Sequence, residues 1–161
     1  MHSVKDDFFQ LAKERYTHVR DIDIDTRFID IVRRFNNIDG VVSMWSCSGH
    51  TPEEIYDEMQ KYEGDIVQPS FNSKSDIIFV VDEKSALNII TSLSKFVDSF
   101  TIEEFLLYRP SINLIQLLSP FKMKSDLLKY NAIQIKMNTQ LSQGDFSVYD
   151  QWIKLLENFG V

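Results

Sequence analysis

The sequence has little cysteine, glycine and proline, and it has no long apolar run. Its single cysteine among 161 residues excludes an internal disulfide and is typical of a reducing compartment. Apolar runs such as Ile77–Val81 are far shorter than the ~20 residues that a membrane-spanning helix needs. The N-terminal stretch lacks the basic start and apolar core of a signal peptide. We therefore expect a cytoplasmic protein that does not contact a membrane.

Basic residues are also scarce relative to acidic ones. Lysine and arginine total 17 against 24 aspartates and glutamates, so the net charge is −7 and the pI is about 4.9. Proteins that bind nucleic acid broadly neutralise its phosphates with lysine and arginine. The composition therefore argues against broad nucleic-acid binding, although it leaves room for a local basic pocket. It equally fits a protein whose acidity only keeps it soluble.

The residues that are present predict one globular domain. Apolar residues make up 43% of the chain and include twelve phenylalanines, and 161 residues is an ordinary size for a single domain. We expect an α/β (α+β) fold over residues 1–161. An N-terminal helical pair over 1–37 would precede a sheet with covering helices over 41–161. The sheet is expected to be mixed and mostly antiparallel, with about five strands.

Five segments have the composition or the alternation of strands. Residues 76–81 are apolar on both faces, as in a central covered strand, whereas residues 132–138 alternate apolar and polar side chains. Residues 101–109 are ambiguous, because Thr101 and Glu104 resemble a helix capping box while Arg109-Pro110-Ser111 resembles a turn. Over 100–118 we favour two antiparallel strands, which would flank that turn. The predicted strands are 41–46, 76–81, 105–108, 112–118 and 132–138.

Apolar side chains recur with helical spacing between these segments. The predicted helices cover 4–19, 27–37, 52–62, 83–97 and 146–158. Asp25 or Thr26 suits the cap of the second helix. Thr51 suits the cap of the third and Asp82 that of the fourth. The side chains expected to be buried in the last two helices are Leu87, Ile90, Leu93, Val97, Phe146, Tyr149, Ile153 and Leu156, with Trp152 alongside.

One stretch concentrates the scarce residues. Residues 41–52, which read VVSMWSCSGHTP, hold the only cysteine, one of three histidines, one of two tryptophans and one of five glycines. The pattern predicts a strand that passes through a glycine-containing loop into a helix. This stretch is the candidate ligand-binding site, and its residues are Trp45, Ser46, Cys47, Ser48, Gly49, His50 and Thr51.

A strand–loop–helix junction of this kind favours an anionic or nucleotide-like ligand. Its backbone amides and its helix N-terminus offer hydrogen-bond donors and positive partial charge. Gly49 would let a ligand approach the backbone closely, and Trp45 would stack on a base. Glu53 and Glu54 partly neutralise the helix end, so a plain turn with a helix cap is the alternative.

The same loop suggests a thiolate–imidazolium pair between Cys47 and His50, because a helix N-terminus favours a thiolate. A working pair needs an orienting third group, for which Asp39 and Asp82 are the best carboxylates. A buried and inert cysteine is the alternative, so catalytic residues stay unassigned. No metal site is predicted, because the other two histidines lie on a different segment without ligand spacing.

The residues from Asn36 to His50, NNIDGVVSMWSCSGH, resemble a pattern of the tRNA wybutosine-synthesis methyltransferase family. In that pattern an asparagine-bearing helix end precedes a strand rich in small hydroxyl residues, which leads into Ser-Cys-Ser-Gly. The resemblance implies S-adenosylmethionine, a tRNA substrate and a ligand site around residues 46–49. The sequence departs from the family at His50, where the family usually has arginine. The stretch is also similar to small uncharacterised bacterial and phage proteins with a Ser-Cys-x-Gly-His loop.

Three functions from different classes stay open. The first is the binding of a nucleotide-like or anionic small ligand, with or without turnover, which predicts that Ser46, Gly49 and His50 line a concave pocket. The second is methyl transfer from S-adenosylmethionine. The third is that of a phage-type acidic accessory protein that binds and inhibits a host protein. This third hypothesis predicts a contiguous acidic or apolar patch away from the loop.

Overall fold

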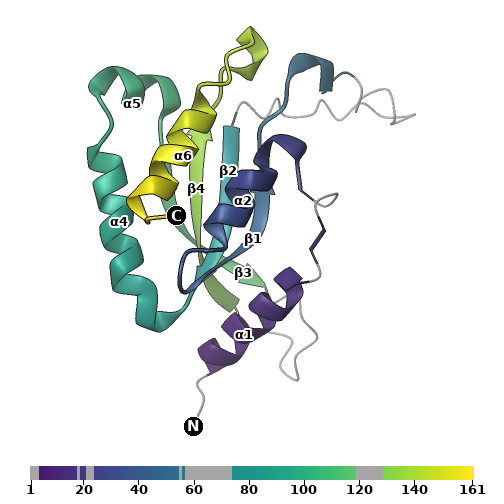
Figure 1. The fold of residues 1–161 in the computed structure, drawn as a ribbon, viewed down its shortest axis with the longest axis vertical. Helices are drawn as coiled ribbons and strands as arrows, with labels where there is room; N and C mark the ends of the chain where they lie inside the picture. The colour runs from purple at the N-terminus through teal and green to yellow at the C-terminus, as the bar shows by residue number, and fades with distance from the viewer. Residues whose placement is uncertain (1–3, 18, 21–23, 55, 57–73, 119–128) are drawn as a thin grey trace.

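The computed structural model describes residues 4–17, 19–20, 24–54, 56, 74–118 and 129–161 (Figure 1). The described residues form an α+β fold around one sheet whose strand order is β1-β2-β4-β3. Every neighbouring pair in it is antiparallel. The predicted α+β class is confirmed, but the described sheet has four strands instead of about five. The strands are β1 (Val41–Cys47), β2 (Lys74–Val81), β3 (Ser111–Leu118) and β4 (Lys129–Asn138).

The central strand β2 is covered on both faces, as the sequence predicted. Alternate residues of a strand point to opposite faces, and Phe79 belongs to a large apolar cluster while Val80 belongs to a smaller one. The smaller cluster contains Phe9 and Ala12 of α1 (Val4–Thr17). Helix α1 therefore covers the face of the sheet opposite to the large cluster.

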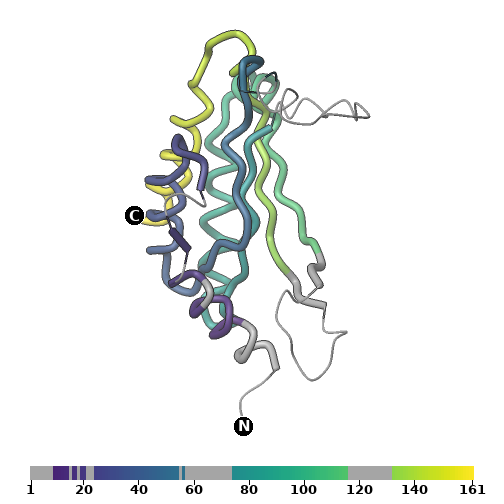
Figure 2. The backbone as a smooth tube through the Cα atoms, turned by 90° about the vertical axis from the view of Figure 1, so that its right-hand side faces the viewer, coloured from purple at the N-terminus to yellow at the C-terminus, as the bar shows by residue number. Residues whose placement is uncertain are grey.

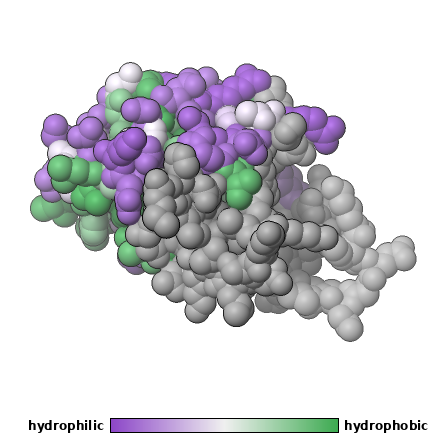
Figure 3. Space-filling model, turned by 90° about the horizontal axis from the view of Figure 1, so that it is seen from below, coloured by the Kyte–Doolittle hydropathy of each residue, from purple (hydrophilic) through white to green (hydrophobic). Residues whose placement is uncertain are grey.

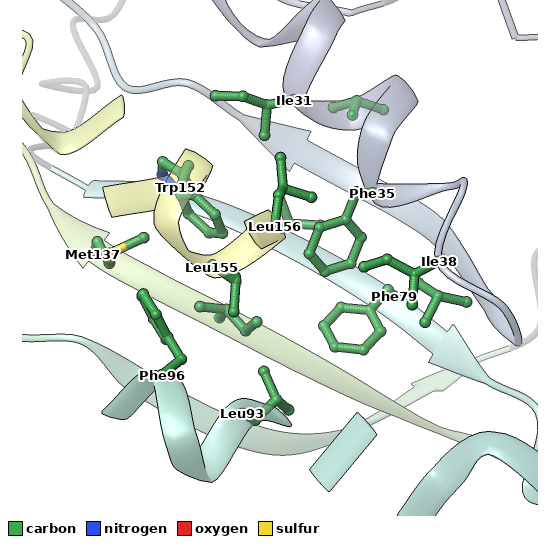
Figure 4. Close-up of a cluster of buried hydrophobic side chains, with 14 of the residues drawn as sticks. Ile31, Phe35, Ile38, Phe79, Leu93, Phe96, Met137, Trp152, Leu155 and Leu156 are labelled. Carbon is green, nitrogen blue, oxygen red and sulfur yellow. The ribbon is translucent and has the colours of Figure 1, made fainter. Parts of the chain in front are cut away.

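The large cluster is formed by three helices on the other face of the sheet. These are α2 (Ile29–Phe35), α4 (Ala86–Asp98) and α6 (Val148–Asn158). Figure 2 shows α2 and α6 on one side of the sheet, and Figure 4 shows their side chains meeting over it. Trp152 is fully buried there, and its indole N–H donates to Oγ of Ser75 at 2.8 Å. That bond satisfies a donor that would otherwise be costly to bury.

The segment predicted as a strand over 105–108 is a helix, α5 (Ile102–Tyr108). The capping box that the sequence offered is present, since Oγ1 of Thr101 accepts from the Glu104 amide and Oε1 of Glu104 accepts from the Thr101 amide. Glu104 also accepts from Nε2 of Gln151 in α6 at 2.9 Å. Arg109 ends the helix in the left-handed conformation, with φ of 41°. The cap and the contact with α6 outweigh the strand propensity of the segment.

Helix α4 is present, but its predicted buried face was largely wrong. Leu93 is buried as expected, whereas Leu87, Ile90 and Val97 are exposed, and Leu87 is 75% exposed. The buried residues beside Leu93 are Ile89 and Phe96. Apolar residues lie on more than one face of this helix, so their spacing is compatible with two orientations. Packing on the sheet selects one of them.

Helix α6 follows its prediction more closely. Trp152 and Leu156 are buried, and Tyr149 and Ile153 are half-buried. Phe146 was expected to be buried but is exposed, because it precedes the helix, and the Arg27 guanidinium lies over its ring, 5.5 Å from the ring centroid.

Short 3-10 turns precede two of the helices and follow β4. They are η2 (Thr26–Phe28) before α2, η3 (Glu83–Ser85) before α4, and η4 (Leu141–Gln143). The predicted cap Asp82 accepts from the Lys84 amide at 3.4 Å, whereas Asp25 makes no capping bond to η2. Residues 52–54 are helical, and most of the predicted helix over 52–62 lies outside the described residues.

Candidate functional site

The predicted site lies at the end of β1, which is an edge strand of the described sheet. After Cys47 the chain leaves the sheet, and Gly49 adopts φ of 85°. A Cβ on Gly49 would lie 3.0 Å from Cγ2 of Thr139 and 3.1 Å from Cδ1 of Leu141. Gly49 is therefore needed for close packing against the segment after β4. The sequence had suggested a different role for Gly49, the close approach of a ligand to the backbone, and that role stays a prediction.

Ser48 is buried and anchors the loop on two sides. Its amide and its hydroxyl both donate to Oδ2 of Asp25, at 2.9 and 3.1 Å. Its carbonyl oxygen accepts from the hydroxyl of Tyr149 in α6 at 3.0 Å. Burial raises the pKa of Tyr149, against smaller lowering contributions from Ser48 and Arg27. The Ser48 amide was expected to bind an external anion, but a carboxylate of the chain already occupies it.

Thr51 caps the helical turn that follows, as predicted. Its Oγ1 accepts from the Glu54 amide at 3.3 Å, and Oε2 of Glu54 accepts from the Thr51 amide at 3.1 Å. This reciprocal pair is a capping box, and it uses a second amide that an anionic ligand would have needed. Glu54 also forms a salt bridge with Arg27.

Partial burial raises the pKa of Glu54, but the Arg27 guanidinium and the Thr51 amide together lower it by more. The net pKa of Glu54 is therefore below its ordinary value of 4.5. The hydrogen bond to Glu54 likewise raises the pKa of Arg27. The pair is charged at neutral pH and links η2 to the turn after the loop.

Cys47, His50 and Glu54 form a consecutive series of side chains. Sγ of Cys47 lies 3.5 Å from Nε2 of His50, and Nδ1 of His50 lies 3.6 Å from Oε2 of Glu54. The carboxylate that faces His50 is therefore Glu54, whereas the predicted candidates Asp39 and Asp82 do not lie near the pair. Those two residues flank the opposite end of β1, which six residue steps of ~3.3 Å place roughly 20 Å away.

A cavity of about 400 Å³ opens along β1, at the edge of the described sheet, beside this series. Its walls come from the end of α1, the connector before η2, helix α2 and strand β1. Within it Ser43 is held by Asn36, whose Oδ1 accepts from the Ser43 amide at 2.8 Å. Most of the wall is apolar, and Asp25 supplies the carboxylate. The lining residues are Tyr16, Val19, Ile24, Asp25, Val32, Ser43, Met44, Trp45, Ser46, Cys47 and His50.

The cavity divides the predicted site residues into two groups. Four of them line it, namely Trp45, Ser46, Cys47 and His50. Ser48, Gly49 and Thr51 do not, because they hold the loop in place through the contacts described above. Ser46 and His50 line this cavity, as expected, whereas Gly49 is not among its lining residues.

Sequence reasoning missed Asp25, Ser43 and Tyr16 as cavity residues. Asp25 was interpreted as a helix cap, and nothing in the local pattern indicates that it reaches a serine 23 positions away. Glu54 did carry a usable signal, because it lies in the first turn after the Thr51 cap and follows His50 by only four positions.

The described part of the chain holds no cluster of three or more His, Cys, Asp or Glu side chains placed to hold a metal ion. None of the helices described there is long and apolar enough to cross a membrane. Comparisons of the chain with protein-family models, with curated proteins and with solved structures found no match.

Proposed function

We propose that the chain binds a small, uncharged, nucleoside-like molecule in the cavity along β1. The cavity itself carries the proposal, because its volume of about 400 Å³ lies within the ~300–1,000 Å³ typical of small-molecule sites. Its wall is mainly apolar with a few convergent polar groups, which is also typical of such sites.

Trp45 supports a ligand with a planar ring. Its side chain is 60% exposed although it lies in β1 and lines the cavity. An exposed tryptophan at the edge of a cavity offers a face on which a base can stack, with a contribution of ~1–3 kcal/mol per base. The other tryptophan, Trp152, is fully buried and cannot take this role.

The charges of the site favour a neutral ligand over the anion that the sequence suggested. The amides of Ser48 and Thr51 are used by Asp25 and Glu54, so two donors of the expected anion cradle are occupied. Asp25 adds a carboxylate to the wall, which repels phosphate and accepts hydrogen bonds from hydroxyl or amino groups. A nucleoside fits these groups better than a nucleotide.

Tryptophan fluorescence tests this proposal. Adenosine and uridine should change the Trp45 emission saturably, and they should raise the melting temperature because they bind the folded state. Adenosine monophosphate should bind more weakly than adenosine. The variant Trp45→Phe should lose the optical signal, since buried Trp152 supplies only a constant background. The absence of both a saturable signal and a melting shift at millimolar nucleoside would refute the proposal.

Methyl transfer remains the alternative that the resemblance suggests, and S-adenosylmethionine belongs in the same titration. The implied ligand site included Ser48 and Gly49, which are buried and engaged within the chain. A melting shift with S-adenosylmethionine that exceeds the shift with adenosine would favour methyl transfer over simple nucleoside binding.

A second candidate function, binding to another protein, is favoured by exposed apolar side chains away from the loop. They gather on α4, α5 and β3, and Figure 3 shows hydrophobic surface on the side where α4 lies in Figure 1. Strand β3 is an edge strand without charged residues, so it lacks a common defence against pairing with another chain. The most exposed of these side chains are Leu87, Ile102, Leu106 and Leu114.

The interaction hypothesis is tested by the double variant Leu106→Lys and Leu114→Lys. It should abolish capture of a protein partner, such as an inhibited host protein, while its melting temperature stays unchanged. Light scattering distinguishes such a partner from a second copy of the chain. Glu157→Lys is the matched control, because it alters the net charge by the same two units at an exposed position on α6. Equal capture by the double variant would contradict the hypothesis.

A further inference from the structure

We propose that Cys47 is a nucleophile whose proton is taken by His50, and that it reacts with an uncharged carbon electrophile admitted to the β1-edge cavity. The inference deepens the proposed function and rests on it, since the same cavity would hold the reacting molecule. Two separate observations support it. Cys47 and His50 both line the cavity, and the remote nitrogen of His50 faces a carboxylate.

The geometry assigns a role to each of three side chains. Sγ of Cys47 lies 3.5 Å from Nε2 of His50, which is within reach of a hydrogen bond to sulfur. Nδ1 of His50 lies 3.6 Å from Oε2 of Glu54, so a carboxylate stands where an imidazolium would need one. Cys47 is the group that would form the covalent bond. His50 is the base, and Glu54 is a positioning residue that acts through His50.

The positioning carboxylate is itself held firmly. Glu54 is bound by the Arg27 side chain from η2 and by the amide of Thr51. Such a third group keeps the imidazole in one orientation, so that its other nitrogen points at the thiol. A cysteine that serves only to fill the core would have no need of a histidine supported in this way.

The step balances without any further reactant. The Cys47 thiol proton passes to Nε2 of His50, and the thiolate sulfur forms a bond to the electrophilic carbon. The bond from that carbon to its leaving group breaks, and the group departs with the electron pair. The proton on His50 then neutralises the leaving group or is lost to water. An uncharged electrophile is favoured because Asp25 in the cavity wall repels anions.

Other titratable groups around the pair are few among the described residues. Asp25 and Tyr16 lie in the cavity wall, and Arg27 lies behind Glu54. Asp76 stands opposite Cys47 in the register of β1 and β2. Burial raises the pKa of Asp76, against smaller lowering contributions from Gln134 and Lys136. The pH dependence of the reaction rate of Cys47 must therefore be compared between the wild type and variants of His50 and Glu54.

Alkylation by iodoacetamide tests the inference on the intact chain. The sequence has one cysteine, so every alkylated molecule reports on Cys47. At about pH 7 an ordinary thiol is mostly protonated, and His50→Gln should slow the reaction about ten-fold or more. The difference should shrink well above the ordinary thiol pKa of ~8.5, where the thiol ionises without a base. It should vanish in concentrated guanidinium chloride.

Glu54→Gln provides a second variant and should slow the reaction at neutral pH by less than His50→Gln does. Equal rates for the wild type and both variants would overturn the inference. A rate difference that stays constant up to high pH would also overturn the inference. That pattern would mean that the substitutions change only how easily iodoacetamide reaches the Cys47 thiol. Fluorescence titration of Cys47→Ser with adenosine separates the two proposals. If this variant still binds adenosine while Cys47 of the wild type proves unreactive, the nucleophile is refuted and nucleoside binding stands.

Discussion

Asp25 and Ser48 are joined by two hydrogen bonds that end on a single carboxylate oxygen, Oδ2, at 2.9 and 3.1 Å. The bonds connect the segment before η2 with the loop after β1, 23 positions further along the chain. Because Asp25 also lines the cavity, the residue that fixes the loop is part of the cavity wall.

Removal of that carboxylate should therefore destabilise the fold. Asp25→Ala leaves the buried Ser48 amide without its partner, which costs about 1–3 kcal/mol. Urea denaturation measures the loss. Asp30→Ala is the control, because Asp30 is exposed and its contact with Arg34 is 3.8 Å long. Such a surface pair contributes at most ~0.5 kcal/mol. Equal losses in the two variants would show that the Asp25–Ser48 bonds have no energetic role.

The Glu54–Arg27 pair should make stability depend on pH in one direction. The pKa of Glu54 is lowered in the folded chain, so its contribution is present above the unfolded pKa and is lost as pH falls through the folded pKa. The gap in unfolding free energy between wild type and Glu54→Gln should therefore be present at neutral pH and close under acid. We expect a gap of ~0.2–1 kcal/mol, because both side chains are partly exposed. A gap that widens under acid contradicts the assignment.

Gly49 should tolerate no side chain. Gly49→Ala combines a left-handed φ of 85° with a Cβ placed 3.0 Å from Thr139 and 3.1 Å from Leu141. Gly144 has a similar φ of 73° and nothing within 4 Å of the added Cβ, so Gly144→Ala isolates the conformational cost. That cost is about 1 kcal/mol, and Gly49→Ala should exceed it by a further ~1–3 kcal/mol for overpacking. Thermal melts of the two variants give the comparison, and equal melting temperatures would disprove the close packing.

Helix α5 should depend on its capping box. Thr101→Ala removes the acceptor of the Glu104 amide and should cost about 1 kcal/mol. The Thr91 hydroxyl, in contrast, donates to the Leu87 carbonyl on the exposed side of α4, so Thr91→Ala should be close to neutral. Chemical denaturation of both variants checks the difference. If Thr101→Ala is as mild as Thr91→Ala, the cap does not hold the helix.

Glu104 gives the same helix a tertiary contact. The amide and hydroxyl of Thr101 and the Gln151 amide lower the pKa of Glu104, and Lys154 lies 3.8 Å from it. The contacts with Gln151 and Lys154 come from α6, and together with the cap they explain why a segment that reads Phe-Leu-Leu-Tyr at its end is helical. Local composition favoured a strand there, since aromatic and apolar residues suit a half-buried sheet.

Local patterns did identify the elements that depend on short-range physics. The strands at β1, β2, β3 and β4 follow from apolar runs, apolar alternation and turn residues, and the cap at Thr51 follows from its residue type just before a helical turn. The buried face of α4 was missed because its apolar residues allow two orientations. Contact with Phe96 and Leu93 on the sheet side selects one of them.

The sequence by itself determined that Cys47 and His50 lie close together where a strand passes into a loop, because residues three positions apart in a turn cannot be far apart. Only the tertiary structure decided what surrounds them. Asp25 occupies the Ser48 amide, Glu54 is the carboxylate behind His50, and the end of α1 closes a cavity over β1. Most of these partners are distant in the sequence, and their contacts form only when helices pack on the sheet. A linear pattern therefore predicts where the reactive residues lie, and the packing decides what they can bind.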